Sequence, residues 1–240
     1  LPVAPKASIG WWKFAGDAKD SSGKGHDGTA NGEPTYVAGM DGQAIQMDGV
    51  DDFVVVGSVG ISGAMPRTIA GWAKADTTNI TDWTNVFGFT STPDGGNYLS
   101  FDIDKIGGAN NYCIHVYGWE TGYVAIDLEW HHLAATYDGT TVKWFHGGKL
   151  AGSAALTLNT IDNVQMGKRG HAAGGNWPGA VDDVRIYDYA LSELEVKSLA
   201  GYVPERMLPD AWAGDKVVSV ALSASGPHAV NQALKVTYNT

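Results

Sequence analysis

Cysteine is nearly absent from this chain. Among 240 residues there is one, Cys113. A single thiol excludes an internal disulfide and a cysteine-based metal cluster. Cys113 alternates with Tyr112 and Ile114 in a strand-like run, which is typical of a small, core-facing apolar residue. Stability must therefore come from packing, and 44% apolar residues in a chain of this length can form a sizeable core.

Long apolar runs and an excess of basic residues are missing as well. No stretch approaches the roughly 18 apolar residues of a membrane span, and no basic and apolar leader precedes Leu1. We therefore expect a mature form or an excised piece of a longer protein. Sixteen Lys and Arg against 26 Asp and Glu give a net charge of −10. This balance argues against nucleic acid or an anionic membrane surface as a partner, and favours cations and neutral ligands.

Glycine is abundant, with 32 residues and no repeating period, which is typical of many tight turns between short strands. Strand-like runs cover residues 10–14, 43–48, 53–56, 68–75, 86–89, 98–103, 112–117, 123–126, 132–137, 142–146, 164–166 and 180–187. Asp138-Gly139 and Gly147-Gly148 join the runs 133–137 and 142–146 and the segment from Leu150 onward into a meander. The pattern predicts an all-β fold, a two-sheet antiparallel β-sandwich or jelly roll.

One short helix is predicted near the C-terminal end of this region. Ser192 and Glu195 form a capping box, which satisfies the free backbone N–H groups of a first helical turn. Leu191, Leu194 and Leu199 are available for one apolar face of this helix. We expect the helix to lie against the sandwich.

The last part of the chain has a different character. Pro204 and Pro209 mark a linker, and residues 217–221 and 233–238 read as two further strands, too few for a domain. We therefore predict a first domain over residues 1–201, and over 202–240 a linker with the opening strands of a second β-sandwich. Such tail strands can pair with another domain or with a neighbouring chain.

Carboxylates occur inside two of the strand-like segments, 47–56 and 179–187. Alternation places Asp182 on the same face as Val184 and Ile186, a pattern typical of a core face. A buried carboxylate needs compensation, since its desolvation costs several kcal/mol. Two interpretations remain: Asp182 accepts backbone N–H groups at a turn, or it binds Ca²⁺.

Several motifs follow one another in a specific order. They are Trp11/Trp12-x-Phe14, Asp20-Ser21-Ser22-Gly23-x-Gly25, Gly39-x-x-Gly42-x-Ala44, Met47-Asp48-Gly49-x-x-Asp52-x-Val54, Ile69-x-Gly71-Trp72, Trp130-His131-His132, Tyr137-Asp138-Gly139 and Val181-Asp182-Asp183-Val184-Arg185-Ile186-Tyr187-x-x-Ala190-Leu191-Ser192. In this order they resemble the laminin-G-like, concanavalin A-like jelly-roll domains of bacterial extracellular proteins, over about residues 8–200.

This resemblance implies a non-catalytic module of a secreted or cell-surface protein, which often binds glycans and in many members holds Ca²⁺. The carboxylates of the family carry over to Asp20, Asp48, Asp52 and Asp182, with Asp51 and Asp183 as their neighbours. One departure is the Gly147-Gly148 turn, where the family usually has Asp-Gly.

Catalysis has few candidates. Asp102-Ile103-Asp104 and Asp127-Leu128-Glu129 have the alternation of a carboxylate pair, but both are more typical of solvated strand ends. His131 and His132 should point to opposite faces of a strand, so they cannot share one metal ion. The other histidines, His146 included, are isolated in the sequence, and we expect no enzyme.

Aromatic residues are in surplus, with nine Trp and ten Tyr. Aromatic rings stack on the apolar face of pyranoses, while polar side chains meet the hydroxyls. The candidates beside glycine- and asparagine-rich loops, where exposure is expected, are Trp83, Tyr98, Trp119, His171 and Trp177. The alternative is that these side chains anchor their loops to the sandwich.

The sequence thus favours an extracellular or cell-surface recognition module that binds a glycan and is stabilised by Ca²⁺. A structural or adhesive building block that binds neighbouring protein subunits remains the alternative. A glycoside hydrolase is the third hypothesis.

Overall fold

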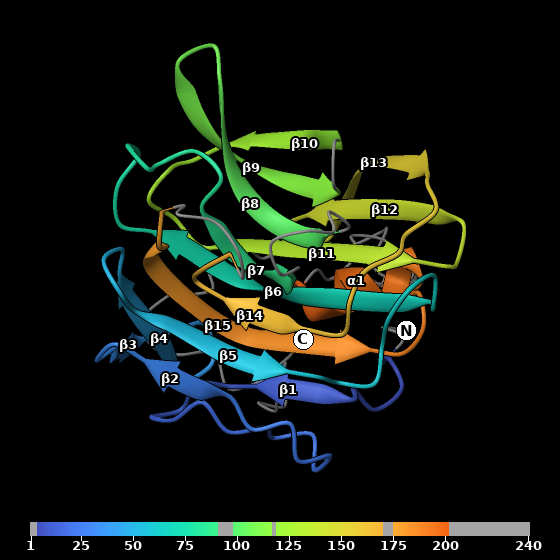
Figure 1. The fold of residues 1–240 in the computed structure, drawn as a ribbon, viewed down its shortest axis with the longest axis horizontal. Coiled ribbons are helices and arrows are strands. Elements are labelled where there is room, and N and C mark those ends of the chain that lie inside the picture. The colour runs from blue at the N-terminus through green and yellow to red at the C-terminus, as the bar shows by residue number, and fades with distance from the viewer. Residues whose placement is uncertain (1–3, 91–97, 117–118, 170–174, 202–240) are drawn as a thin grey trace, which may run out of the picture.

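Two antiparallel β-sheets form the molecule. The computed structural model describes residues 4–90, 98–116, 119–169 and 175–201. Sheet A has the strand order β13-β12-β11-β6-β15-β4-β3, with β1 also paired to β15; sheet B has the order β10-β9-β8-β7-β14-β5-β2 (Figure 1). This arrangement confirms the predicted two-sheet sandwich of the concanavalin A-like type.

The strands of sheet A are β1 (Gly10–Trp12), β3 (Thr35–Ala38), β4 (Gln43–Asp48), β6 (Arg67–Ala75), β11 (His131–Tyr137), β12 (Thr141–His146), β13 (Lys149–Ala155) and β15 (Pro178–Tyr187). Those of sheet B are β2 (Thr29–Asn31), β5 (Phe53–Gly57), β7 (Asn85–Phe89), β8 (Leu99–Ile106), β9 (Ala109–Val116), β10 (Trp119–Ala125) and β14 (Val164–Met166). The meander β11-β12-β13 confirms both predicted hairpins. Strands β2 and β3 were not predicted, because they are short and mostly exposed.

The core lies between the inner faces of the two sheets. Ile69 and Val184 of sheet A and Phe87 and Phe101 of sheet B belong to one buried cluster. Gly71 of β6 leaves room for Val184 on the neighbouring strand β15 and for Phe87 across the core, since a Cβ there would lie 2.9 Å from Val184 and 3.4 Å from Phe87. Outside this core, Cys113 is buried on the face of β9 opposite to Tyr112 and Ile114, and burial raises the pKa of its thiol.

Strand β15 contains a bulge that corrects one prediction. Its register with β6 shifts between Asp182 and Arg185, and Asp183 has a φ of 48°. The extra residue breaks the alternation. Val181, Val184 and Ile186 therefore all join the inner core, whereas Asp182 lies on the outer face of sheet A. The expectation that Asp182 shares a face with Val184 and Ile186 is wrong.

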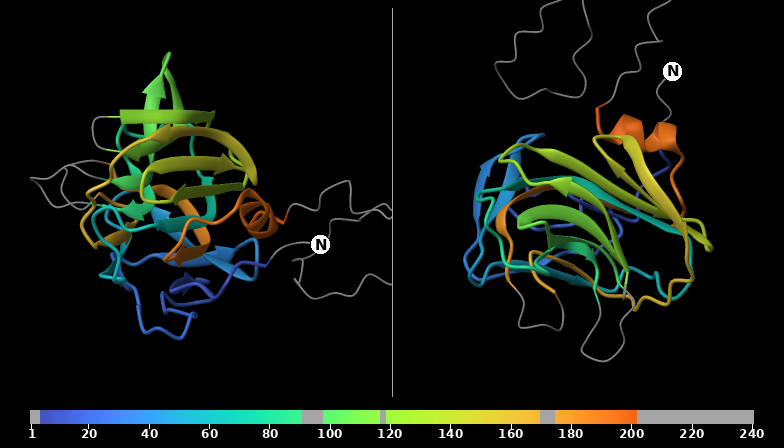
Figure 2. Two further views of the ribbon diagram at one scale, coloured as in Figure 1. Left: turned by 90° about the vertical axis from the view of Figure 1, so that its right-hand side faces the viewer. Right: turned by 90° about the horizontal axis from the view of Figure 1, so that it is seen from above.

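Helix α1 (Glu193–Leu199) covers part of the outer face of sheet A (Figure 2). Its capping box between Ser192 and Glu195 is present as predicted. Leu191, Val196 and Leu199 pack against this sheet, but Leu194 is 53% exposed, so its assignment to the apolar face was wrong. This seven-residue helix, the one in the described part of the chain, lacks the length and apolarity to cross a membrane. The predicted tail strands lie outside the described residues.

Candidate functional site

A cluster of aromatic and charged side chains lies on the outer face of sheet B. Along β8, Leu99, Phe101 and Ile103 point into the core, so Ser100 and Asp102 point outward. The same alternation turns His115 of β9 outward. We call this cluster the cradle; it comprises Trp83, Tyr98, Asp102, His115, Glu120 and Arg169.

Asp102 is the hub of the cradle. Its Oδ1 accepts hydrogen bonds from Asn85 Nδ2 and Ser100 Oγ, both at 3.0 Å. Its Oδ2 lies 2.8 Å from His115 Nδ1 and accepts from Arg169 Nε at 3.0 Å and Nη2 at 2.5 Å. The Asp102 carboxylate is fully buried and the Arg169 side chain is 9% exposed. The expectation that Asp102 is a solvated strand end is therefore wrong.

The charge state of Asp102 follows from these partners. Burial opposes ionisation of the carboxyl group. The hydrogen bond from His115 and the positive charge of Arg169 outweigh that cost and lower the pKa of Asp102 below its usual value. The carboxylate is thus ionised at neutral pH, and every acceptor position on it is engaged. His115 also links the hub to Glu120, with Nε2 to Oε1 at 3.3 Å.

Trp83 gives the cradle an exposed aromatic ring. The side chain is 39% exposed, and the residue has a φ of 65°, a conformation that is costly for a bulky residue. Its backbone N–H donates to Ile103 O at 2.8 Å, which holds the loop against β8. The guanidinium of Arg169 lies 5.1 Å from the Trp83 ring, and His115 lies 5.5 Å from it. Backbone strain of this kind persists where the surrounding structure holds the residue in place, and here the contacts with Ile103, Arg169 and His115 do so.

The other predicted aromatic residues differ in position. Tyr98 belongs to the cradle, 4.9 Å from the His115 ring, but it is only 4% exposed and so lies beneath the surface. Trp177 is fully buried between the sheets against Tyr112, so the expectation that it is exposed is wrong. Trp177 directly precedes β15, which is mostly buried, and this position in the sequence indicates a buried side chain. Trp119 begins β10, and His171 lies outside the described residues.

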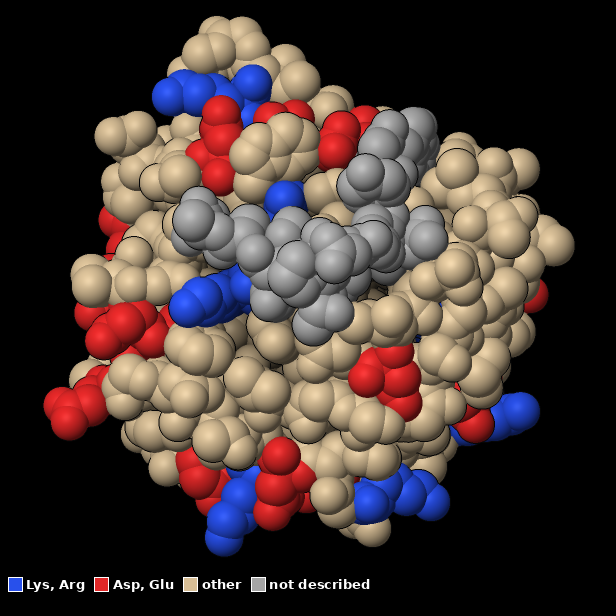
Figure 3. Space-filling view, in the orientation of Figure 1, with Lys and Arg blue, Asp and Glu red and all other residues tan. Residues whose placement is uncertain are grey.

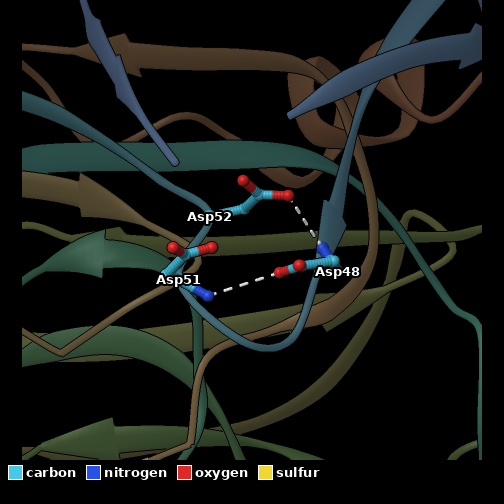
Figure 4. A group of neighbouring side chains, drawn as sticks. All are labelled: Asp48, Asp51 and Asp52. Atoms are coloured by element: carbon cyan, nitrogen blue, oxygen red, sulfur yellow. Dashed lines mark hydrogen bonds between the residues drawn. The ribbon is translucent and has the colours of Figure 1, made fainter. Parts of the chain in front are cut away.

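A second site is acidic. A hollow of about 620 Å³ is lined by eight residues, of which five are acidic and, among those that the structure describes, none is basic: Gly32, Glu33, Thr35, Gln46, Asp48, Asp51, Asp52 and Asp76. Within it, carboxylate oxygens of Asp48, Asp51 and Asp52 lie within 4.8 Å of one another (Figure 4). Asp48 ends β4, and Asp51 and Asp52 lie in the turn that leads to β5; the two strands belong to different sheets.

Backbone N–H groups orient two of these carboxylates. Asp52 is 4% exposed and accepts from Glu33 N at 2.8 Å and Asp48 N at 3.1 Å. Asp48 accepts from the N–H groups of Val50 and Asp51, and the bond from Val50 is the main cause of the lowered pKa of Asp48. The side chain of Asp51 is exposed. Three hard oxygen donors at this spacing suit Ca²⁺.

The two remaining predicted metal ligands lie elsewhere. Asp20 accepts hydrogen bonds from the backbone N–H groups of Trp11, Ser22 and His26, and so closes its own loop. Asp182 Oδ2 accepts from Met40 N at 2.7 Å, while its buried Oδ1 has no hydrogen-bond partner among the described residues. Burial raises the pKa of Asp182 to about 6. The structure thus brings Asp48 and Asp52 together and leaves Asp20 and Asp182 apart from them.

Charge on the outer face of sheet B is mixed. Among the residues drawn in colour, Figure 3 shows acidic groups interspersed with basic ones on this side of the molecule.

The chain belongs to the concanavalin A-like lectin/glucanases superfamily, whose family profile matches residues 48–197. The comparison with curated proteins gives no match. Among solved structures, domain 4 of AbnA, an extracellular GH43 arabinanase from Geobacillus stearothermophilus solved with arabinotriose, is similar with a TM-score of 0.68 and 21% identity. The match covers 80% of this chain and 98% of that one.

Two further structures share the fold. Trypanosoma rangeli sialidase in complex with 2,3-difluorosialic acid has a TM-score of 0.65 and 15% identity over 83% of this chain and 35% of the sialidase. Botulinum neurotoxin type C, whose cell entry depends on interaction with two ganglioside molecules, has a TM-score of 0.57 and 12% identity over 80% of this chain and 50% of that one. The chain therefore corresponds to only part of these two larger proteins.

Proposed function

We propose that this chain is a non-catalytic, extracellular glycan-binding module whose binding face is the cradle. The observation that carries this proposal is the exposed Trp83 ring, held beside the polar groups of Arg169, His115 and Glu120. Such a ring can stack on the apolar face of a sugar, while the polar groups around it bond to hydroxyls. The net negative charge of the chain favours a neutral glycan over an acidic one.

The engaged state of Asp102 argues against catalysis. A glycoside hydrolase needs two carboxyl groups that flank the scissile bond, about 5–5.5 Å apart for retention or 6.5–9.5 Å for inversion. Asp102 is fully buried and uses its acceptor positions on Asn85, Ser100, His115 and Arg169. It cannot reach a substrate, which leaves Glu120 as the one cradle carboxylate near the surface.

Similarity supports the glycan assignment. The arabinanase domain is matched over nearly its whole length and is described with arabinotriose bound, as part of an extracellular enzyme. A module of the same size in this chain can serve the same purpose, which is to hold a glycan for a secreted or surface protein.

Binding to arabino-oligosaccharides and to a glycan array tests the proposal. We expect Trp83→Ala to weaken binding about 10-fold or more, since stacking contacts of this kind contribute about 1.4 kcal/mol or more. Leu150→Ala is the matched control, because Leu150 is 42% exposed but lies on sheet A. Wild-type protein that binds no sugar on the array would instead favour the structural or adhesive role.

We further propose that the acidic hollow binds Ca²⁺. Asp48, Asp51 and Asp52 gather three carboxylates, and in the described part of the chain none of them forms an ion pair. A cation would relieve their mutual repulsion and join the β4–β5 turn across the two sheets. Asp182 lies apart from this hollow, and its buried Oδ1 has no hydrogen-bond partner among the described residues, so we do not include it among the ligands.

Thermal unfolding tests the Ca²⁺ proposal. At a Ca²⁺ concentration about 100 times Kd, binding to the folded state alone adds about 2.7 kcal/mol. Addition of EDTA should remove this increment. Asp51→Asn should abolish the response to Ca²⁺, because it removes one of the three carboxylates. The Asp51 side chain is exposed, so its replacement leaves the hydrogen bonds of Asp48 and Asp52 intact and should not itself destabilise the fold. Asp188→Asn, at another exposed carboxylate, should respond like wild type.

A further inference from the structure

Two histidines that are 15 residues apart in the sequence meet at one end of sheet A. Strands β11 and β12 pair with Leu133 opposite His146. His131, two residues before Leu133, points to the same side of the sheet as His146. His146, isolated in the sequence, thus has a histidine partner in the fold, while His132, buried beside Trp72, points to the opposite face from His131 as predicted.

The two imidazole rings lie almost parallel. Their centroids are 4.8 Å apart with an interplanar angle of 27°. His131 Nδ1 lies 2.5 Å from His146 Nε2, while His131 Nε2 lies 2.7 Å from Asp127 Oδ1. Asp127 comes from the loop before β11, and its Oδ1 also accepts the N–H of Glu129 at 2.8 Å. Asp127, His131 and His146 thus form a chain of three polar groups.

The carboxylate fixes which nitrogen of His131 carries the proton. An ionised Asp127 only accepts hydrogen bonds, so Nε2 of His131 must donate to it. In the neutral ring, Nδ1 then presents a lone pair toward Nε2 of His146. This arrangement, in which a carboxylate orients one imidazole nitrogen and frees the other, is the usual outer contact of a metal-bound histidine.

We propose that His131 Nδ1 and His146 Nε2 together bind one divalent transition-metal ion of the zinc, copper and nickel group. Imidazole nitrogens favour these ions, whereas Ca²⁺ prefers oxygen. Tetrahedral Zn²⁺ with bonds of about 2.0–2.1 Å needs its nitrogens about 3.3 Å apart. The two nitrogens must therefore move apart by less than about 1 Å, and one ring must turn so that both lone pairs meet at the ion; His146, partly exposed before the Gly147-Gly148 turn, is the ring that we expect to move.

Water would complete the coordination from the side of His146, which is partly exposed, because the His131 side chain is only 10% exposed while that of Asp127 is 59% exposed. Asp127 stays outside the coordination sphere and acts by orienting His131. The site differs in both position and ligand chemistry from the acidic hollow, so the two metal proposals can fail independently.

Titration of the full chain, first stripped of metal, with Zn²⁺ and with Cu²⁺ tests the proposal by calorimetry. We expect one equivalent to bind, and His146→Gln to weaken that binding at least 30-fold. Asp127→Asn should weaken it about 10-fold, the typical effect of losing an outer carboxylate. His26→Gln is the matched control, since His26 lies in the loop after β1, and its affinity should equal that of wild type.

A second measurement uses the wild-type protein alone, so that it does not depend on how the variants fold. The Cu²⁺ electron paramagnetic resonance spectrum should show coupling to two imidazole nitrogens. Ca²⁺ in excess should leave the Zn²⁺ isotherm unchanged. The proposal is overturned if neither ion binds below about 1 mM, or if His146→Gln binds like wild type; the two rings would then share only a proton.

Discussion

Replacement of Asp102 by Asn tests the central interaction of the cradle. Asn has the shape of Asp but no charge, so the variant leaves the Arg169 guanidinium, 9% exposed, without its carboxylate. Removing one partner of a buried ion pair typically costs about 3–5 kcal/mol, because the other charge stays buried without compensation. We therefore expect Asp102→Asn to lower the free energy of unfolding by about that amount. In a chain of this size the midpoint of thermal unfolding should fall by about 6–20 °C.

Urea denaturation at pH 7 measures this loss, with Asp104→Asn as the control. Asp104 lies two residues further along β8, is partly exposed, and should cost less than about 0.5 kcal/mol when replaced. The double variant of Asp102→Asn with Arg169→Gln should recover part of the loss, because it removes both charges. A loss below about 1 kcal/mol, or additive effects in this cycle, would refute the buried ion pair.

The pH dependence of stability tests the same ion pair, because the lowered pKa of Asp102 predicts the direction of the change. The pKa of Asp102 is lowered in the folded state, so the carboxylate stabilises the protein at pH values above the usual aspartate pKa of 3.8. This contribution is lost as the pH falls through the folded pKa. The difference in stability between wild type and Asp102→Asn should therefore be complete above about pH 5 and shrink in stronger acid.

Three further predictions follow from burial. With EDTA present, the free energy of unfolding should fall by up to about 3 kcal/mol as the pH rises from about 4 to 6. Burial raises the pKa of Asp182 to about 6, so the folded state holds this proton to a higher pH than the unfolded state does. Asp182→Asn should lack this fall. Trp177→Ala should cost about 3–5 kcal/mol in urea denaturation, and near wild-type stability would refute its place in the core. Deletion of residues 202–240 should leave the melting midpoint unchanged, since the two hydrophobic clusters formed by the described residues are complete between Ile9 and Leu199; a truncated chain that does not fold would place the tail within the first domain.

The sequence by itself determined the features that depend on neighbours along the chain. Alternation located β4 and β14 with their observed bounds, and Asp138-Gly139 and Gly147-Gly148 located the two hairpins. The capping box at Ser192 located the start of α1. In each case the stabilising partners are only a few residues apart, so local spacing contains the information.

Only the tertiary structure decided which side chains form the sites. The bulge at Asp183 turns Asp182 to the outer face, because one extra residue reverses the alternation. Asp102 and Arg169 are 67 residues apart in the chain, and His131 and His146 meet only through the register of two strands. A buried charge is stable only when its partner is in place, and the order and register of the strands within each sheet, not the local sequence pattern, bring those partners together.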